Sequence, residues 1–312
     1  MTALLDRRLL FVTGKGGVGK STVAAGLALL AAHNGKRTLV CEVDAKGNLA
    51  DFFETSPLAF KAREVQPSLW AMAMNTEESL KEYLGLQLKL PLIARIGPLA
   101  HTFDFVATAA PGVKEILTVG KLTWEVREDN YDLVVVDAPA TGHIVGQLRA
   151  PEAIRELVSV GMVREQTGWM TDLLTDASKT GVVIVASPEE MPVTESLELI
   201  ERLADTNVDV AAVIVNRVLP ELFGRGEEEI FERLEGDETS NVLSSVVGGP
   251  ATPVIEAARL AVTLRRTRAE HLDRLRAGVD PTLPVLFLPE LFTRSHGMRA
   301  TTVVAERLGE EL

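Results

Sequence analysis

Residues 14–22 read Gly14-Lys15-Gly16-Gly17-Val18-Gly19-Lys20-Ser21-Thr22. This run matches the phosphate-loop pattern G-x-x-x-x-G-K-[ST], and it stands between an apolar run and a helical pattern, as that motif requires. The glycines let backbone N–H groups converge on phosphate oxygens, and the start of the helix adds the positive end of its dipole. We expect Lys20 to reach the β- and γ-phosphates of a bound nucleotide and the Ser21 hydroxyl to bind Mg²⁺. A glycine-rich turn without a ligand is the alternative.

Short apolar or β-branched runs recur along the chain, and each leads into turn residues. They are Leu9–Thr13, Thr38–Val43, Leu69–Met74, Leu133–Val136, Gly181–Ala186, Val210–Val215 and Leu283–Leu288. Runs that do not alternate with polar residues are typical of parallel strands covered on both faces. Helical patterns lie between them, at Ser21–His33, Thr76–Leu84, Lys114–Arg127, Ala153–Leu174, Pro192–Ala204 and Val254–Leu275. The alternation predicts an α/β fold, a P-loop NTPase with a doubly wound, mainly parallel sheet.

Two intervals between strands are too long for simple crossovers. They run from Asn75 to Asn130 and from His143 to Lys179, and both have helical patterns. We expect them to form a helical subdomain from about residues 75–130 and 143–179 beside the sheet. No long Gly/Ser/Pro linker divides the chain, so residues 1–312 are predicted to form a single domain.

Composition excludes several classes of protein. The chain has 312 residues, 46% of them hydrophobic, and its 32 Lys+Arg and 44 Asp+Glu give a net charge of −12. This acidic balance argues against nucleic acid or an anionic membrane as the main partner. The single cysteine, Cys41, excludes an intrachain disulfide and any metal or iron–sulfur site that needs two thiolates per chain. The longest apolar run, Val23–Ala32, is about half of a bilayer-spanning helix. We expect a cytoplasmic protein with no direct membrane insertion.

Acidic residues follow two of the predicted strands. Asp44 comes after Thr38–Val43, where it is placed either to orient or deprotonate an attacking water or to cap a following helix. Asp137 comes after Leu133–Val136, the usual position of the carboxylate that holds hydrated Mg²⁺ in a phosphate-loop protein. Ligands bind at the carboxyl ends of parallel strands, so both acids are candidates for one site.

The phosphate loop has a second lysine, Lys15, and with it Gly14–Thr22 resembles the deviant Walker A motif. That motif belongs to the family of partitioning, septum-site, nitrogenase-iron-protein and arsenite-pump ATPases. In that family the extra lysine acts on the nucleotide of a partner across a dimer interface. The resemblance implies that ATP and Mg²⁺ are the cofactors, that Lys15, Lys20 and Asp44 are catalytic, and that two chains form a nucleotide-sandwich dimer.

Two further segments resemble the switches of the arsenite-pump and tail-anchored-protein-targeting (ArsA-like) branch. Asp44, Asn48 and Leu49 match the first switch, whereas Ala45, Lys46 and Gly47 depart from its usual Pro-Ala-His. The second switch is matched by Asp137 and by the sequence Thr141-Gly142-His143. His143 is alternatively a residue at a helix start that contacts Asp137. The partitioning and septum-site branches normally lack the Thr-Gly-His ending, so this segment favours the ArsA-like branch.

The same resemblance implies an adenine site. Asn216 follows the strand Val210–Val215, and a side-chain amide can both donate to and accept from an adenine edge. Pro289 and Leu291 lie in a segment, Leu288–Phe292, that resembles the adenine-flanking loop of the family. Turn chemistry is the alternative for Asn216 and Pro289, because both residue types favour turns.

Three functions compete on these residues. The favoured one is an ATPase whose dimer, with itself or with an ArsA-like paralogue, opens and closes to control a hydrophobic protein client. A partitioning or septum-site ATPase is disfavoured by the acidic tail Glu306–Leu312, and a weakly hydrolysing subunit paired with a paralogue stays open because of the altered first switch. With one cysteine, neither arsenite transport nor an interfacial zinc is implied. The apolar stretch Leu86–Val113 is either part of a client groove or part of a core.

Overall fold

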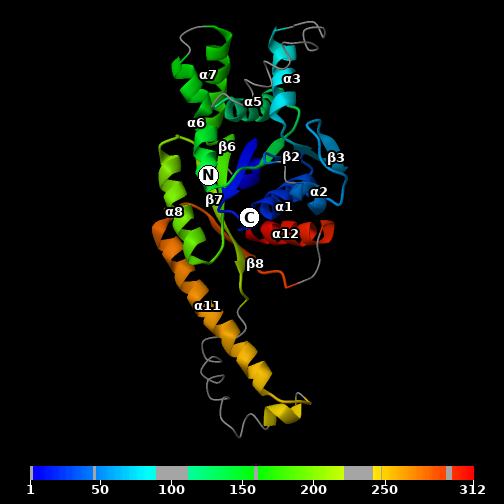
Figure 1. Ribbon diagram of the computed structural model, residues 1–312, viewed down its shortest axis with the longest axis vertical. Helices are drawn as coiled ribbons and strands as arrows, with labels where there is room; N and C mark the ends of the chain where they lie inside the picture. Colours follow the sequence, from blue (N-terminus) through cyan, green and yellow to red (C-terminus); the bar gives the residue numbers. More distant parts are fainter. Residues whose placement is uncertain are drawn as a thin grey trace.

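The computed structural model describes residues 3–44, 47–88, 112–157, 161–220, 242–246, 248–292 and 297–312 (Figure 1). Within these residues eight strands form one sheet, in the order β3-β4-β2-β5-β1-β6-β7-β8. The strands are β1 (Leu9–Gly14), β2 (Thr38–Glu42), β3 (Arg63–Gln66), β4 (Leu69–Ala73), β5 (Leu133–Asp137), β6 (Thr180–Ala186), β7 (Val210–Val218) and β8 (Val285–Pro289).

The sheet is parallel except at one edge, where β3 pairs antiparallel with β4. The predicted α/β fold with a mainly parallel sheet is therefore confirmed. The edge strand β3 was not predicted, because its sequence Arg-Glu-Val-Gln is polar and the side chains are exposed or half-buried. Strand β7 also continues past Val215 to Val218, so Asn216 lies within the strand and not after its end.

Helices cover both faces of the sheet. On one face lie α1 (Lys20–His33), α2 (Asn48–Phe52) and α12 (Met298–Glu311), and on the other α5 (Val113–Arg127), α6 (Thr141–Leu157), α7 (Met162–Thr175) and α8 (Glu190–Ala204). Helix α3 (Thr76–Leu88) contacts α5, and the long α11 (Thr252–Gly278) contacts α8 and extends away from the sheet (Figure 1).

Helix α1 is apolar on nearly all sides because it lies between the sheet and α12. Its residues from Val23 to Leu29 are all buried. A side chain on Gly26 would come within 2.6 Å of Val304 on α12, so glycine allows the two helices to pack closely. This packing holds the start of α1, and with it the phosphate loop, in a fixed position against the sheet.

One helix prediction was wrong, and helix α12 (Met298–Glu311) was missed. The single helix predicted over Ala153–Leu174 is two helices, α6 and α7, because Gly161 adopts a φ of +97°, which a continuing helix cannot contain. Helix α12 was not predicted, although it buries Thr301, Val304, Ala305 and Leu308 at helical spacing.

The helices α3, α5, α6 and α7 gather at one end of the molecule (Figure 1). Their grouping into a subdomain of a single 1–312 domain stays a prediction. Most of the stretch Leu86–Val113 lies outside the described residues, which omit 89–111 and the side chains of 86–88. None of the helices in the described part of the chain is both long enough and apolar enough to cross a bilayer.

Candidate functional site

The phosphate loop joins β1 to α1, and its two ends are held by contacts that only glycine permits. A side chain on Gly14 would lie 2.1 Å from the carbonyl oxygen of Val185 on β6. Gly19 has a φ of +95°, and a side chain there would lie 2.3 Å from Nδ2 of Asn216. Between these ends, side chains on Gly16 and Gly17 would meet nothing within 4 Å. The fold therefore fixes the loop while leaving its backbone accessible to an anionic ligand.

Asp137 ends β5 beside the first residues of α1. This is the position predicted for an acid at the end of the apolar run Leu133–Val136. It is 6% exposed and hydrogen-bonds to Ser21. Burial raises the pKa of Asp137 to about 6, with contributions from Glu42 and Asp44, while Ser21 and Lys20 act in the opposite direction. A buried carboxylate beside a hydroxyl and other carboxylates is a hard oxygen donor set that fits Mg²⁺. Ser21 and Asp137 are the residues that would hold the ion.

We expect Mg²⁺-dependent nucleotide binding to weaken as the pH falls through about 6, because protons then compete with the cation for Asp137. The raised native pKa means that the folded state holds this proton more tightly than the unfolded state. This carboxyl therefore stabilises the cation-free protein increasingly as the pH falls from about 6 towards the ordinary value of 3.8. Calorimetric titration of ADP with and without Mg²⁺, at several pH values, measures the binding effect.

Asp137→Asn is the matched variant for this prediction. The nucleotide titrates in the same way with both proteins, so the difference between them belongs to Asp137. An identical pH dependence of the Mg²⁺ effect in both proteins would contradict the assignment.

The first switch lies between β2 and α2, and residues 45–46, which include the departures Ala45 and Lys46, are outside the described part. Asp44 follows β2 and is half-buried. Asn48 begins α2, and its Nδ2 lies 3.5 Å from Oγ of Ser21. The backbone N–H groups of Gly47 and Asn48 donate to Glu42 and not to Asp44, so the helix-cap alternative for Asp44 is not what the structure has.

The second switch begins at the end of β5 and continues into α6. The Thr13 hydroxyl donates to the carbonyl oxygen of Pro139 at 2.8 Å and so ties the switch to β1. His143 lies in the first turn of α6 and, with Asp44, Lys114 and Gln147, lines a cavity of about 170 Å³. The two switches therefore meet at one cavity that also contacts α5.

Lys15 is held by an acid of its own chain. Its Nζ forms an ion pair with Glu195 on α8, and the other carboxylate oxygen of Glu195 accepts from the Thr141 hydroxyl at 3.2 Å. Both side chains of the ion pair remain partly exposed, at 29% and 27%. Lys15 is therefore connected to the second switch through a glutamate that the sequence did not single out.

The three residues predicted to contact adenine line one cavity of about 140 Å³. Asn216, Pro289 and Leu291 contribute to it together with Gly19 and Arg217. Nδ2 of Asn216 donates to the carbonyl oxygen of Val18 at 2.9 Å, which places the cavity directly beside the phosphate loop.

Residues 7–167 and 157–239 match the model of a family described as anion-transporting ATPase. The chain is 36% identical over 299 residues to ATPase BagA of Mycobacterium tuberculosis, covering 91% of this chain and 86% of that protein. It is 28% identical over 248 residues to an ATPase ASNA1 homolog of Entamoeba dispar, covering 67% and 76%. It is 25% identical over 261 residues to ATPase get3 of Pyrenophora tritici-repentis, covering 70% and 77%.

Proposed function

Because this chain belongs to the anion-transporting ATPase (ArsA) family and is an ATP-binding ATPase, we propose that it works as a Mg²⁺-dependent nucleotide-sandwich dimer. Its open and closed states control the binding of a hydrophobic protein segment or a partner subunit. The observation that carries this proposal is the position of Lys15. Its ammonium group is ion-paired with Glu195 on α8, and both side chains are partly exposed, so exchange of Glu195 for the phosphates of a second chain would need no buried charge to be uncovered.

The site residues have separable roles in this proposal. The backbone of residues 14–19 and Lys20 bind and orient the phosphates, and Asp44 orients the water or takes its proton as the water oxygen attacks the γ-phosphorus. The bond between that phosphorus and the β–γ bridging oxygen breaks as the new P–O bond forms. Mg²⁺, held by Ser21 and Asp137, would neutralise negative charge on the phosphates. Lys15 of the opposite chain would stabilise the same charge, after leaving Glu195.

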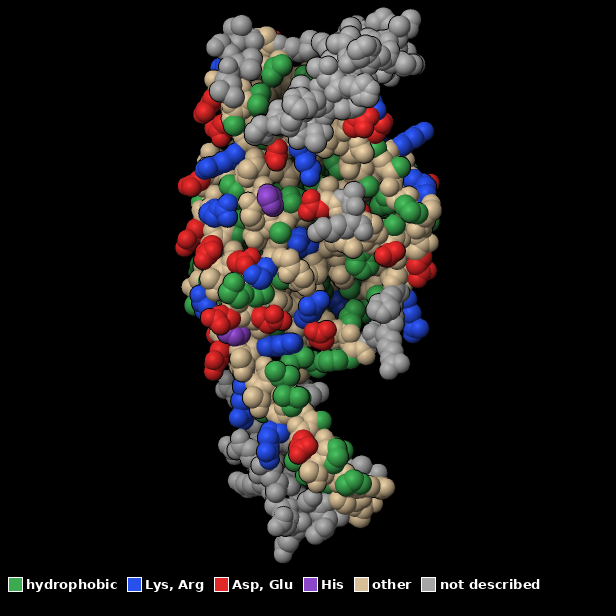
Figure 2. Space-filling model, viewed as in Figure 1, with side chains coloured by type: hydrophobic (Ala, Val, Ile, Leu, Met, Phe, Trp, Pro, Cys, Tyr) green, Lys and Arg blue, Asp and Glu red, His purple; other side chains and the backbone are tan. Residues whose placement is uncertain are grey.

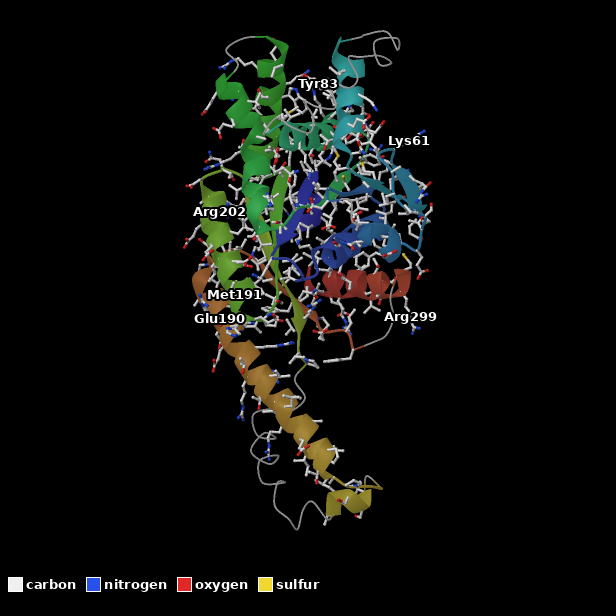
Figure 3. The ribbon with its side chains drawn as sticks, viewed as in Figure 1. Lys61, Tyr83, Glu190, Met191, Arg202 and Arg299 are labelled. Carbon is white, nitrogen blue, oxygen red and sulfur yellow. The ribbon has the colours of Figure 1, made fainter. Side chains whose placement is uncertain are left out.

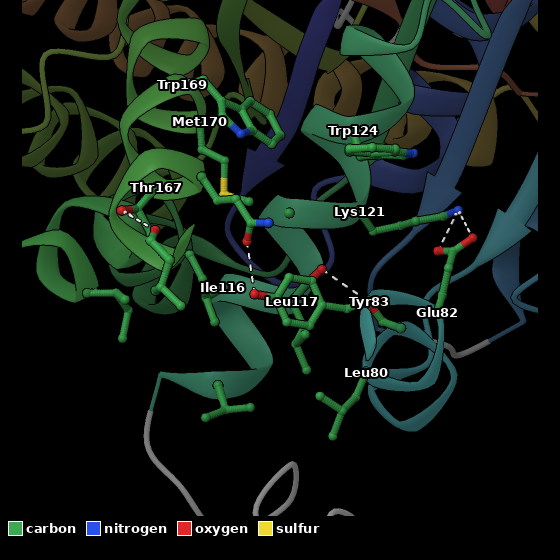
Figure 4. Close-up of a pocket in the computed structure, with 16 residues that line it drawn as sticks. Leu80, Glu82, Tyr83, Ile116, Leu117, Lys121, Trp124, Thr167, Trp169 and Met170 are labelled. Carbon is green, nitrogen blue, oxygen red and sulfur yellow. Dashed lines mark hydrogen bonds and ion pairs between the residues drawn. The ribbon is translucent and has the colours of Figure 1, made fainter. Parts of the chain in front are cut away.

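The proposed client site is an apolar cavity of about 230 Å³ among α3, α5, α6 and α7 (Figure 4). Leu80, Ile116, Leu117, Trp124 and Met170 are among the residues that line it. Polar groups at its border are already paired with each other: Tyr83 with Gln166 at 2.9 Å, and Lys121 with Glu82 at 2.9 Å. The buried indole Nε1 of Trp169, which also lines the cavity, has no hydrogen-bond partner. The mainly apolar walls suit an apolar side chain of a protein segment.

The charge distribution also suits a protein partner better than a polyanion. Figure 2 shows Lys and Arg side chains interspersed with Asp and Glu over the visible face, and the chain carries a net charge of −12. A polyanion such as nucleic acid is held mainly by clustered basic side chains. These features support the client proposal over a partitioning-type function on DNA.

We expect Gly120→Leu to weaken binding of a hydrophobic peptide at least about tenfold by filling the client cavity. Gly120 lies on α5 at the cavity wall, and a side chain there would first meet the flexible end of Met170 at 3.2 Å. Replacing a helical glycine also favours the helix by about 0.5–1 kcal/mol, which offsets part of the cost of moving Met170, and the Tm of the variant measures the net effect on folding. Fluorescence titration with a labelled helical peptide, with ATP and with ADP, measures the effect.

Gly168→Leu on α7 is the matched control. A side chain there would meet nothing within 4 Å, and Gly168 is not among the cavity residues. Equal peptide affinity in the wild type and in Gly120→Leu would place the client elsewhere.

A further inference from the structure

Glu42 is an acid in a position that a sheet normally gives to an apolar residue. It is the last residue of β2, is 2% exposed, and follows Thr38, Leu39, Val40 and Cys41, which are all fully buried. A buried carboxylate without partners would be strongly destabilising, so its hydrogen bonds show what it does. Its Oε2 accepts from the backbone N–H of Gly47 at 3.2 Å, and its Oε1 accepts from that of Asn48 at 2.9 Å.

These two bonds tie the far end of the first switch to the strand from which the switch begins. Gly47 has a φ of +79°, a left-handed conformation that favours glycine and turns the chain into α2. Both oxygens of one carboxylate are used, and charge-assisted bonds of this kind are about twice as strong as neutral ones. A side chain of the sheet therefore holds the Gly47–Asn48 end of the first switch.

The bonds reach the metal-holding residues through Asn48. The amide of Asn48 lies 3.5 Å from Oγ of Ser21, and Ser21 in turn hydrogen-bonds to Asp137. Glu42 is also the register partner of Asp137 on the neighbouring strand, so both side chains are on the face covered by α1. One carboxylate thus fixes the backbone of Asn48 at the place where its side chain faces Ser21.

We propose that Glu42 is a positioning residue of the ATPase reaction, which acts by holding Gly47 and Asn48 so that the Asn48 amide stays on Ser21. The inference rests on the proposed function of Ser21, Asp44 and Asp137. The anchor of Gly47 and Asn48 in this chain is a side chain of β2.

A double-mutant cycle tests this role. Glu42→Gln keeps the shape of the side chain, but its NH₂ group faces a backbone N–H, so one bond is lost. We expect Glu42→Gln and Asn48→Ala each to lower ATP turnover at least about tenfold, while the Kd for ATP stays within about twofold. The double variant should be no slower than the slower single variant, because both changes break the same connection. Losses that multiply would overturn the proposal.

Amide hydrogen exchange supplies a readout that does not depend on activity. The Gly47 and Asn48 amides should exchange at least about tenfold faster in Glu42→Gln than in the wild type, with the Tm unchanged. The control is Glu64→Gln, which alters an exposed acid that accepts from the backbone N–H of Ser68 at 3.3 Å, and it should keep wild-type turnover. Unchanged exchange at Gly47 and Asn48 would contradict the proposal.

Two comparisons separate this inference from the proposed function. If Glu42→Gln turns over normally while Asp44→Asn does not, the positioning role is wrong and the site stands. If both turn over normally, the positioning role of Glu42 and the catalytic role of Asp44 are both wrong. Should Glu42→Gln fail to fold, Asn48→Ala decides alone, and turnover within about twofold of wild type would overturn the role.

Discussion

Asp44→Asn is expected to bind ATP with unchanged affinity and to lose at least about a hundredfold in turnover, because it removes the group proposed to orient or deprotonate the attacking water. Asp44 follows β2 and lines the cavity that His143 and Lys114 also contact. The substitution keeps the size of the side chain, so the phosphate loop and the cavity lined by Asn216 should be unaffected. Single-turnover hydrolysis and equilibrium ATP binding, measured on the same preparation, separate the two effects.

Asp51→Asn is the control for this variant. Asp51 lies on α2, a few residues from the switch, and is exposed. It should hydrolyse ATP at the wild-type rate. Normal turnover in Asp44→Asn would remove Asp44 from the catalytic residues and leave only a structural role at the end of β2.

Lys15→Ala is expected to reduce hydrolysis by about a thousandfold while largely sparing ATP binding, because a cation that stabilises transferring phosphate acts mainly in the transition state. The phosphates of each chain's own nucleotide keep Lys20 and the loop backbone, which explains the retained affinity. Loss of the ion pair with Glu195 costs little by itself, since both side chains are partly exposed. Steady-state hydrolysis and ATP affinity measure the two quantities.

Lys61→Ala is the control for loss of a positive charge, because Lys61 is exposed at the margin of the molecule (Figure 3). It should leave hydrolysis unchanged. Equal loss of affinity and of turnover in Lys15→Ala would mean that Lys15 binds the ground state of its own nucleotide and has no role in trans.

The parts of the site that could be predicted from the sequence are those with local signals. The phosphate loop is one continuous motif. Asp137 ends an apolar run, and in a parallel sheet the residues at the carboxyl ends of neighbouring strands such as β5 and β1 lie at the same edge. Asn216, Pro289 and Leu291, which the resemblance grouped as an adenine site, line one cavity in the structure. Whether these residues bind adenine stays a prediction.

The rest depended on contacts between residues distant in the sequence. Lys15 and Glu195 are 180 positions apart, and neither motif spacing nor periodicity pairs them. Glu42 did carry a signal that was overlooked, because an acid at the end of an otherwise apolar strand needs a partner inside the fold. Helices α6 and α7 are separate because Gly161 has a φ of +97°. The residues on either side of Gly161 have a helical pattern, so the sequence did not indicate this break.

Mixing Lys15→Ala with Asp44→Asn tests whether two chains share one catalytic site. In a mixed dimer the chain that keeps Asp44 receives an intact Lys15 from its partner, so one of the two sites is complete. Random exchange of subunits makes about half of the dimers mixed, so a one-to-one mixture should recover about a quarter of wild-type hydrolysis, far above either parent. If mixtures at every ratio hydrolyse ATP no faster than the parents, Lys15 does not act across the interface and the proposal of a shared catalytic site is wrong.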